Sequence, residues 1–278
     1  MNSAFMGPLP VAVQRAGFEA LTARASPIGM TSRDFFEPAE RTRALCATLV
    51  NADIERVAFV PTVAYAMAVV AKNLHPRPGQ NVVLLGDMFP SNVYPWRKWR
   101  AAGVEMRTVP APVAPWSCFR PETSRAFRWN EDLIHAIDKN TVLVAVEQAH
   151  WTDGTLFDLE RIGARCREVG AAFVIDATQT VGAMPLDVVE VRPDALVVHS
   201  YKSMLSNYGL GFAVFGERFD DASPLEESWL TRRGSENFVR LVDYNDSYAC
   251  GMRRFDTSLR ANPILIRMLE VACTLLIE

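Results

Sequence analysis

Short apolar runs alternate with helical patterns along most of this chain, and this alternation constrains the fold more than any other feature. Seven stretches, most of them rich in Val, Ile, Leu and Phe, have the length of strands, at 56–60, 81–85, 104–109, 141–146, 171–175, 195–199 and 211–215. Helical patterns lie between them, at 38–50, 63–73, 91–102, 131–138 and 159–169. Such alternation predicts an α/β fold with a mainly parallel, seven-stranded sheet and helices on both faces.

Two chemically reactive side chains follow two of these runs. Asp176 comes directly after the run that ends at Ile175, and Lys202 lies three residues past the run that ends at His199. In an open α/β sheet, ligands bind outside the carboxyl ends of the strands, so side chains that follow neighbouring strands converge there. A carboxylate near an amine suits pyridoxal phosphate, because the ring nitrogen must stay protonated and the aldehyde reacts with lysine.

Two other roles for Asp176 stay open at this point. An acid at a strand end also binds ribose in nucleotide folds or a metal ion in phosphate-loop enzymes. Both alternatives are weakened because the chain has neither G-x-G-x-x-G after its first strand nor G-x-x-x-x-G-K-[ST]. A nucleotide-binding α/β protein is therefore the least favoured hypothesis.

The residues around the pair carry a family resemblance. The D-x-x-Q run 176–179 precedes Val-Gly-Ala at 181–183 and Pro-Leu-Asp at 185–187, and Tyr-Lys at 201–202 precedes Gly-Leu-Gly at 209–211. In this order the chain resembles the class V aminotransferase group of fold-type I pyridoxal-phosphate enzymes, which includes cysteine desulfurases, kynureninases, isopenicillin N epimerase-like proteins and carbon-sulfur lyases. The resemblance extends from 7–10 to 254–256. It implies a Schiff base at Lys202 and a ring-nitrogen contact at Asp176.

The resemblance also implies the contacts to the cofactor ring. Gln179, three residues past Asp176, would hydrogen-bond the ring hydroxyl or the Schiff-base region. For Thr178, a hydroxyl contact at the same edge and a cap of the following turn are equally open. Phe89, in an F-P-S-N run, would stack on the pyridine. Trp151 would pack beside the cofactor or substrate. For His150, a contact with the site and a purely structural position are equally open.

For the phosphate, the resemblance implies a cradle at a helix N-terminus, where free N–H groups and the helix dipole favour an anion. Thr62, Val63 and Ala64 follow a predicted strand and open a predicted helix. Because relatives often have a hydroxyl residue where this chain has Val63 and Ala64, backbone N–H groups would carry more of the binding. His199 and Tyr201 would flank Lys202 as further phosphate contacts.

The resemblance predicts three parts of the chain. Residues 1–25 form an N-terminal arm and helix, 26–255 form the cofactor-binding large domain, and 256–278 begin a small C-terminal domain that is truncated relative to other members. In relatives that domain supplies an arginine for the substrate carboxylate, a role that cannot be assumed for Arg253, Arg254 or Arg260. The proline-rich stretch 110–127 is expected to be a long loop. A homodimer is expected, with 255–262 near the partner's phosphate site, although Ser258 replaces a common glycine.

Composition narrows the class of protein and its partners. With 29 basic and 32 acidic residues in 278, the chain offers no electrostatic footprint for nucleic acid or an anionic membrane. Five cysteines without a C-x-x-C pair fit a reducing compartment and argue against a zinc site. Without a signal-peptide pattern, the expected location is cytoplasmic.

The function predicted is that of a pyridoxal-phosphate enzyme that acts on a small amino-acid substrate by aminotransferase, lyase or epimerase chemistry. Cysteine desulfuration is disfavoured, because the nucleophilic cysteine of those enzymes lies in a C-terminal part that this chain does not contain. The alternative is a non-catalytic protein that binds the cofactor or a partner subunit without turnover.

Overall fold

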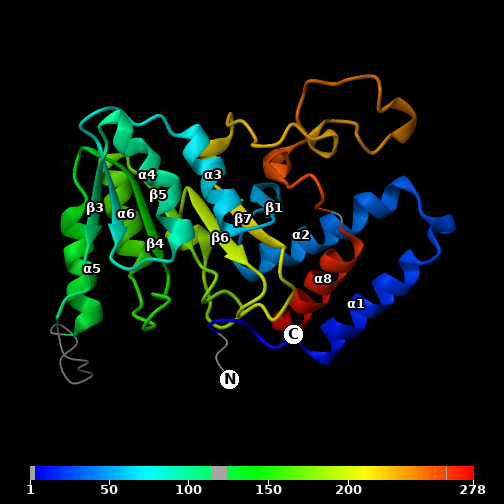
Figure 1. Cartoon of the computed structure of the whole chain (residues 1–278), viewed down its shortest axis with the longest axis horizontal. Coiled ribbons are helices and arrows are strands. Elements are labelled where there is room, and N and C mark those ends of the chain that lie inside the picture. The colour runs from blue at the N-terminus through cyan, green and yellow to red at the C-terminus, as the bar shows by residue number, and fades with distance from the viewer. Residues whose placement is uncertain (1–3, 114–123, 261) are drawn as a thin grey trace.

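The computed structural model describes residues 4–113, 124–260 and 262–278, and a seven-stranded sheet lies at its centre (Figure 1). Every strand predicted from the sequence is present within one residue of its predicted bounds. The strands are β1 (Val57–Val60), β2 (Asn81–Leu85), β3 (Glu105–Val109), β4 (Thr141–Glu147), β5 (Ala172–Asp176), β6 (Ala195–His199) and β7 (Gly211–Phe215).

The sheet is mainly parallel, as predicted. Its order is β1-β7-β6-β5-β4-β2-β3, and β7 alone pairs antiparallel with its two neighbours. Because β7 begins where the other strands end, Gly211 pairs with both Val60 of β1 and His199 of β6. The carboxyl ends of β1 and β6 therefore lie at the same edge of the sheet, one strand apart.

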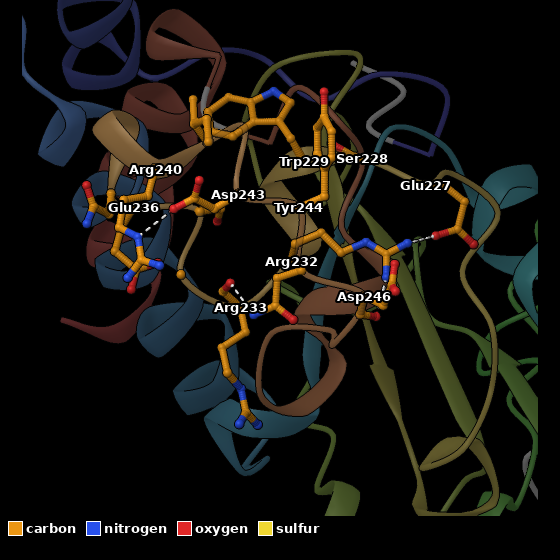
Figure 2. A pocket seen from close by; sticks show the side chains of 15 residues that line it. Glu227, Ser228, Trp229, Arg232, Arg233, Glu236, Arg240, Asp243, Tyr244 and Asp246 are labelled. Atoms are coloured by element: carbon orange, nitrogen blue, oxygen red, sulfur yellow. Dashed lines mark hydrogen bonds and ion pairs between the residues drawn. The ribbon is translucent and has the colours of Figure 1, made fainter.

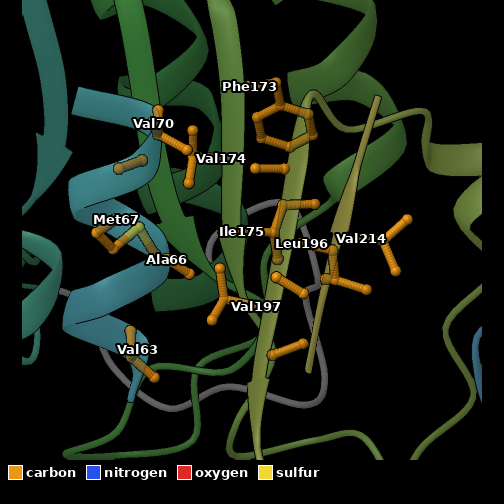
Figure 3. Close-up of a cluster of buried hydrophobic side chains, with 14 of the residues drawn as sticks. Val63, Ala66, Met67, Val70, Phe173, Val174, Ile175, Leu196, Val197 and Val214 are labelled. Atoms are coloured by element: carbon orange, nitrogen blue, oxygen red, sulfur yellow. The ribbon is translucent and has the colours of Figure 1, made fainter. Parts of the chain in front are cut away.

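Helices cover both faces. The crossovers through α3 (Val63–Asn73) and α4 (Tyr94–Arg97) run toward β3, whereas those through α5 (Arg125–Ala136), α6 (Leu159–Val169) and α7 (Val188–Val191) run back. Right-handed crossovers of opposite direction place their helices on opposite faces. Figure 3 shows α3 against one face, with its apolar stripe Val63, Ala66, Met67 and Val70 turned toward the strands. This i, i+3, i+4, i+7 spacing is what buries one side of a helix.

Two predicted helices were wrong in their bounds. The stretch 91–102 is not one helix but α4 flanked by 3₁₀ turns at Pro90–Asn92 and Lys98–Ala102. Pro95 lacks the N–H group that a continuous helix over this stretch needs, whereas the second position of α4 tolerates it. Helix α5 begins at Arg125 rather than near 131, since Ser124 caps it by accepting a hydrogen bond from the Phe127 N–H (3.2 Å). Of the loop predicted at 110–127, residues 114–123 lie outside the described part of the chain.

Three further helices pack together beside β1. Helix α8 (Pro263–Ile277) lies against both α1 (Val11–Arg24) and α2 (Glu37–Leu49), to the right of the sheet in Figure 1. In the part of the chain that the structure describes, no helix has both the length and the apolar character needed to cross a membrane. The three-part division predicted from the sequence stays a prediction.

A buried ion network ties this helical layer to the sheet. The Arg43 guanidinium on α2 pairs with the Asp256 carboxylate (2.7 Å), and Asp256 also binds Arg260 (2.5 Å). Asp256 Oδ1 accepts a hydrogen bond from the Phe59 N–H of β1 (2.7 Å). Arg253 pairs with Glu40 and Glu55 instead. Arg253 and Arg260 are therefore engaged in structural ion pairs.

Candidate functional site

A cavity of about 250 Å³ opens at the carboxyl edge of the sheet. Ser91, Glu147 and Tyr208, which were not predicted, line it. All eleven predicted site residues line it as well: Thr62, Val63, Ala64, Phe89, Trp151, Asp176, Thr178, Gln179, His199, Tyr201 and Lys202. They come from the ends of β1, β2, β4, β5 and β6, as expected for an open α/β sheet. Their contacts with a cofactor stay predictions.

Asp176 ends β5 with its carboxylate held at both oxygens. Oδ1 accepts a hydrogen bond from the Thr178 N–H (2.9 Å), and Oδ2 accepts one from Asn92 Nδ2 (2.9 Å). The two hydrogen bonds fix the orientation of the carboxylate. The site therefore contains a buried, oriented acceptor for a cationic group.

Lys202 is buried in the loop that follows β6. Its Nζ lies 5.4 Å from the centroid of the Phe89 ring and 5.7 Å from that of Tyr201. Burial lowers the pKa of Lys202, against the opposing effect of the Asp176 and Glu147 carboxylates. A lysine with a lowered pKa is more often neutral and thus nucleophilic.

The N-terminal arm packs directly on the segment that carries Lys202. The Gly7 N–H donates to the Tyr201 carbonyl oxygen (2.9 Å), and a Cβ at Gly7 would stand only 2.2 Å from the Lys202 carbonyl oxygen. Gln179 also reaches the arm, where its Nε2 donates to the Ala4 carbonyl oxygen (3.2 Å). Only glycine allows this approach of the two backbones.

His199 carries an orphaned buried atom. Its Nε2 lies 3.2 Å from the Pro61 carbonyl oxygen, which can only accept, so Nε2 bears the hydrogen. Nδ1 is buried and has no hydrogen-bond partner among the described residues. Burial lowers the pKa of His199 to about 4, so the ring is neutral near pH 7. An O–H group of a bound ligand would satisfy Nδ1.

The N-terminus of α3 offers free donors to the same cavity. Thr62 caps the helix by accepting a hydrogen bond from the Tyr65 N–H (3.0 Å). In the described ranges the N–H groups of Val63 and Ala64 make no hydrogen bond. Two free N–H groups at the positive end of a helix form a site suited to an anion.

Phe89 and Trp151 form an aromatic wall. Their rings meet edge to face, with centroids 5.6 Å apart and planes at 84°. The Glu147 carboxylate accepts hydrogen bonds from the backbone N–H groups of both residues. Sequence reasoning missed Glu147, although its position at the end of a predicted strand matches that of Asp176.

His150 lies outside the residues that line the cavity. Its Nδ1 is 2.8 Å from Thr152 Oγ1, its Nε2 is 3.0 Å from the Gly86 carbonyl oxygen, and its ring packs on Trp129. Of its two open roles, the structure supports the structural one.

Figure 2 shows a second and larger cavity, of about 580 Å³, whose lining comes entirely from the segment 227–246. Charges of both signs line it and neutralise one another, as in the Arg232–Glu227 and Arg240–Asp243 pairs. None of the predicted site residues lies there. Its mixed lining indicates no ligand class.

The chain resembles known proteins in sequence and in structure. The family model described as aminotransferase class-V matches residues 18–228. A probable cysteine desulfurase of Methanothermobacter thermautotrophicus is 29% identical over 216 residues, covering 76% of this chain and 51% of the relative. The uncharacterized aminotransferase YcbU of Bacillus subtilis is 26% identical over 234 residues, covering 84% and 57%. The chain thus spans little more than half the length of these curated relatives.

Solved structures show the same fold. The cysteine desulfurase CsdA from Escherichia coli matches with a TM-score of 0.81 at 17% identity, over 100% of this chain and 67% of its own. The cystine C-S lyase C-DES matches with a TM-score of 0.83 at 19% identity, over 99% and 71%. At these identities the likeness establishes the large-domain fold alone.

Proposed function

Because this chain belongs to the aminotransferase class-V family, we propose that it is a pyridoxal-phosphate-dependent enzyme acting on an amino acid. The observation that carries the proposal is one cavity that holds an oriented carboxylate, a buried lysine and a helix N-terminus. These are the acid, amine and anion cradle that this cofactor requires. The orphaned Nδ1 of His199 further supports a bound ligand.

The residues present fit the cofactor. When bound, pyridoxal phosphate supplies an aldehyde and a ring that withdraws electrons from the substrate. Asp176 would hold a proton on the ring nitrogen, because its fixed carboxylate accepts a charged hydrogen bond. The N–H groups of Val63 and Ala64 would hold the phosphate. Phe89 would stack on the ring and keep water from that face.

Lys202 would have two tasks in this site. Its amine would hold the cofactor aldehyde, which its lowered pKa favours. The same amine would move a proton at the α-carbon of the substrate, since it is a buried base that the cavity exposes to a ligand. Thr178 and Gln179 would orient the edge of the ring that carries the hydroxyl group.

The type of reaction is the finer part of the proposal. Transamination, lysis and epimerisation all use this apparatus. Cysteine desulfuration is disfavoured by the sequence, but it is included among the reactions to test because the Methanothermobacter relative is named a probable cysteine desulfurase. Cysteine and cystine are therefore the first substrates to test, followed by the other amino acids.

One observation favours the alternative of a protein that binds cofactor or a partner subunit without turnover. Among the described residues that line the cavity there is no arginine to bind a substrate carboxylate, and Arg253 and Arg260 are engaged elsewhere. A cofactor-loaded protein that shows no spectral change with any amino acid would support this alternative.

A homodimer and a cytoplasmic location complete the proposal. Leu259 in the segment 255–262 is 77% exposed, as a residue that contacts a partner subunit would be in the isolated chain. Light scattering of the purified protein tests the dimer.

The decisive experiment adds pyridoxal phosphate to the purified chain. We expect a visible absorbance band that Lys202→Ala abolishes and that the exposed control Lys139→Ala leaves intact. Borohydride reduction followed by peptide mass mapping should find the cofactor on Lys202. A band that survives Lys202→Ala would refute the assignment.

A further inference from the structure

Glu147 is a buried carboxylate that lies outside the D-x-x-Q and Tyr-Lys motifs. It is the last residue of β4, only 2% exposed, and lies in register with Asp176 at the end of β5. Two carboxylates side by side in a buried site repel each other, and burying each one is costly unless it is hydrogen-bonded. The hydrogen bonds that Glu147 accepts must therefore offset the cost of its burial.

Both oxygens of Glu147 bind groups from other loops. Oε1 accepts a hydrogen bond from the Phe89 N–H (2.9 Å), which follows β2, and Oε2 accepts one from the Trp151 N–H (2.8 Å), which follows β4. One side chain thus connects the two loops that carry the aromatic wall. Neither contact depends on which side chain stands at position 89 or 151.

The amide of Asn92 connects the two acids. Its Nδ2 lies 2.9 Å from Asp176 Oδ2 and 3.4 Å from Glu147 Oε1. The amide thus lies between the carboxylates and reduces their repulsion. Glu147 in turn holds the amide against the oxygen of Asp176 that faces it.

We propose that Glu147 is a positioning residue, whose carboxylate fixes Phe89 and Trp151 as the aromatic wall of the cavity and holds Asn92 against Asp176. The ionised form accepts the two backbone hydrogen bonds most strongly. Burial and the Asp176 charge oppose ionisation and raise the pKa of Glu147 to about 7. The charged groups that face it are Asp176 on β5 and Lys202 after β6.

The first test uses the cofactor-free protein, so it does not rest on the proposed function. In Glu147→Gln the amide accepts one backbone hydrogen bond and presents N–H to the other donor. We expect amide hydrogen exchange at Phe89 or Trp151 to accelerate about 10-fold or more, as expected from the loss of a buried hydrogen bond to a charged group. The exposed control Glu160→Gln should leave both amides protected. Unchanged protection in Glu147→Gln would overturn the proposal.

A second variant covers the case in which Glu147→Gln does not fold. Glu147→Asp keeps the charge, but its shorter side chain cannot reach both N–H groups. It should lose protection at one of the two amides and keep it at the other. Full protection at both would overturn the proposal.

The second test measures the consequence for the cofactor and does rest on the proposed function. Glu147→Gln should bind pyridoxal phosphate about 10- to 100-fold more weakly than Glu160→Gln. It should also show a weaker circular dichroism signal from the bound cofactor, because the wall no longer fixes the ring. If the wild type binds no cofactor while exchange at Phe89 or Trp151 responds as expected, the proposed function fails and the positioning role stands. Equal affinity and equal dichroism in both variants would overturn the role in cofactor binding.

Discussion

Asn92 and Asp176, 84 positions apart in the chain, are joined by a hydrogen bond of 2.9 Å between Asn92 Nδ2 and Asp176 Oδ2. The bond connects the loop after β2 with the end of β5 and orients the carboxylate toward the cavity. A site whose acid is held from two sides is rigid before any ligand arrives, which lowers the ordering cost of binding.

Removing this bond should weaken cofactor binding. Asn92→Ala deletes the donor to Asp176 and leaves the Oδ2 oxygen with one partner fewer. We expect pyridoxal phosphate affinity to fall about 10- to 100-fold, as for the loss of a hydrogen bond to a charged group. A spectroscopic titration measures it. Asn140→Ala, in an exposed turn, is the control and should bind like the wild type.

The close approach of the N-terminal arm makes Gly7 sensitive to any side chain. Gly7→Ala places a Cβ 2.2 Å from the Lys202 carbonyl oxygen, so the arm must move away. We expect a loss of about 1–3 kcal/mol in the free energy of unfolding, as for an overpacked site. Urea denaturation should show it, whereas Gly29→Ala has open space around its Cβ and should have little effect. Equal stability of both variants would contradict the tight contact.

The buried network around Asp256 should dominate the stability of the helical layer. Asp256→Asn leaves the buried Arg43 and Arg260 charges without their carboxylate, which should cost about 3–5 kcal/mol near pH 7. The exposed control Asp221→Asn should cost little.

The cost at Asp256 should also depend on pH. The two arginines hold the pKa of Asp256 below its usual value. An acid whose pKa is lowered by folding stabilises the folded state fully above its unfolded pKa, here near 4. This stabilisation is lost as the pH falls through the folded pKa. The difference between wild type and Asp256→Asn should therefore shrink below about pH 4. A constant difference across this range would contradict the assignment.

His199 should make the protein sensitive to mild acid. Its folded pKa of about 4 lies below the unfolded value of about 6.5. The unfolded state binds the extra proton, so stability is complete above about pH 6.5 and falls as pH decreases toward 4. Protonation of His199 should lower the free energy of unfolding of the wild type by about 1–2 kcal/mol between pH 7 and pH 5. His199→Gln should lack this part of the decrease. Urea denaturation at both pH values measures this decrease. The exposed control His135→Gln should show the same decrease as the wild type.

Six of the strands could be predicted because burial in the sheet requires continuous apolar runs, and such runs are visible in one dimension. The edge strand β3, with the sequence EMRTV, is only partly buried. The 3₁₀ turns on either side of α4 were missed because the apolar pattern of 91–102 continues through them. The early start of α5 was missed because the cap at Ser124 lies in a stretch that reads as a loop.

Asp176 and Lys202 could be predicted as partners from two local facts, the residue type and the position just past a strand. Glu147 satisfies the same two facts, yet nothing in its own segment reveals its role. That role depends on which N–H groups meet its oxygens, and those belong to loops that only the folded sheet brings together. The chain thus encodes the positions of its strands and of Asp176 and Lys202 locally. The wall, the shared amide of Asn92 and the free donors of α3 arise from strand order, because hydrogen bonds between distant segments depend on three-dimensional proximity.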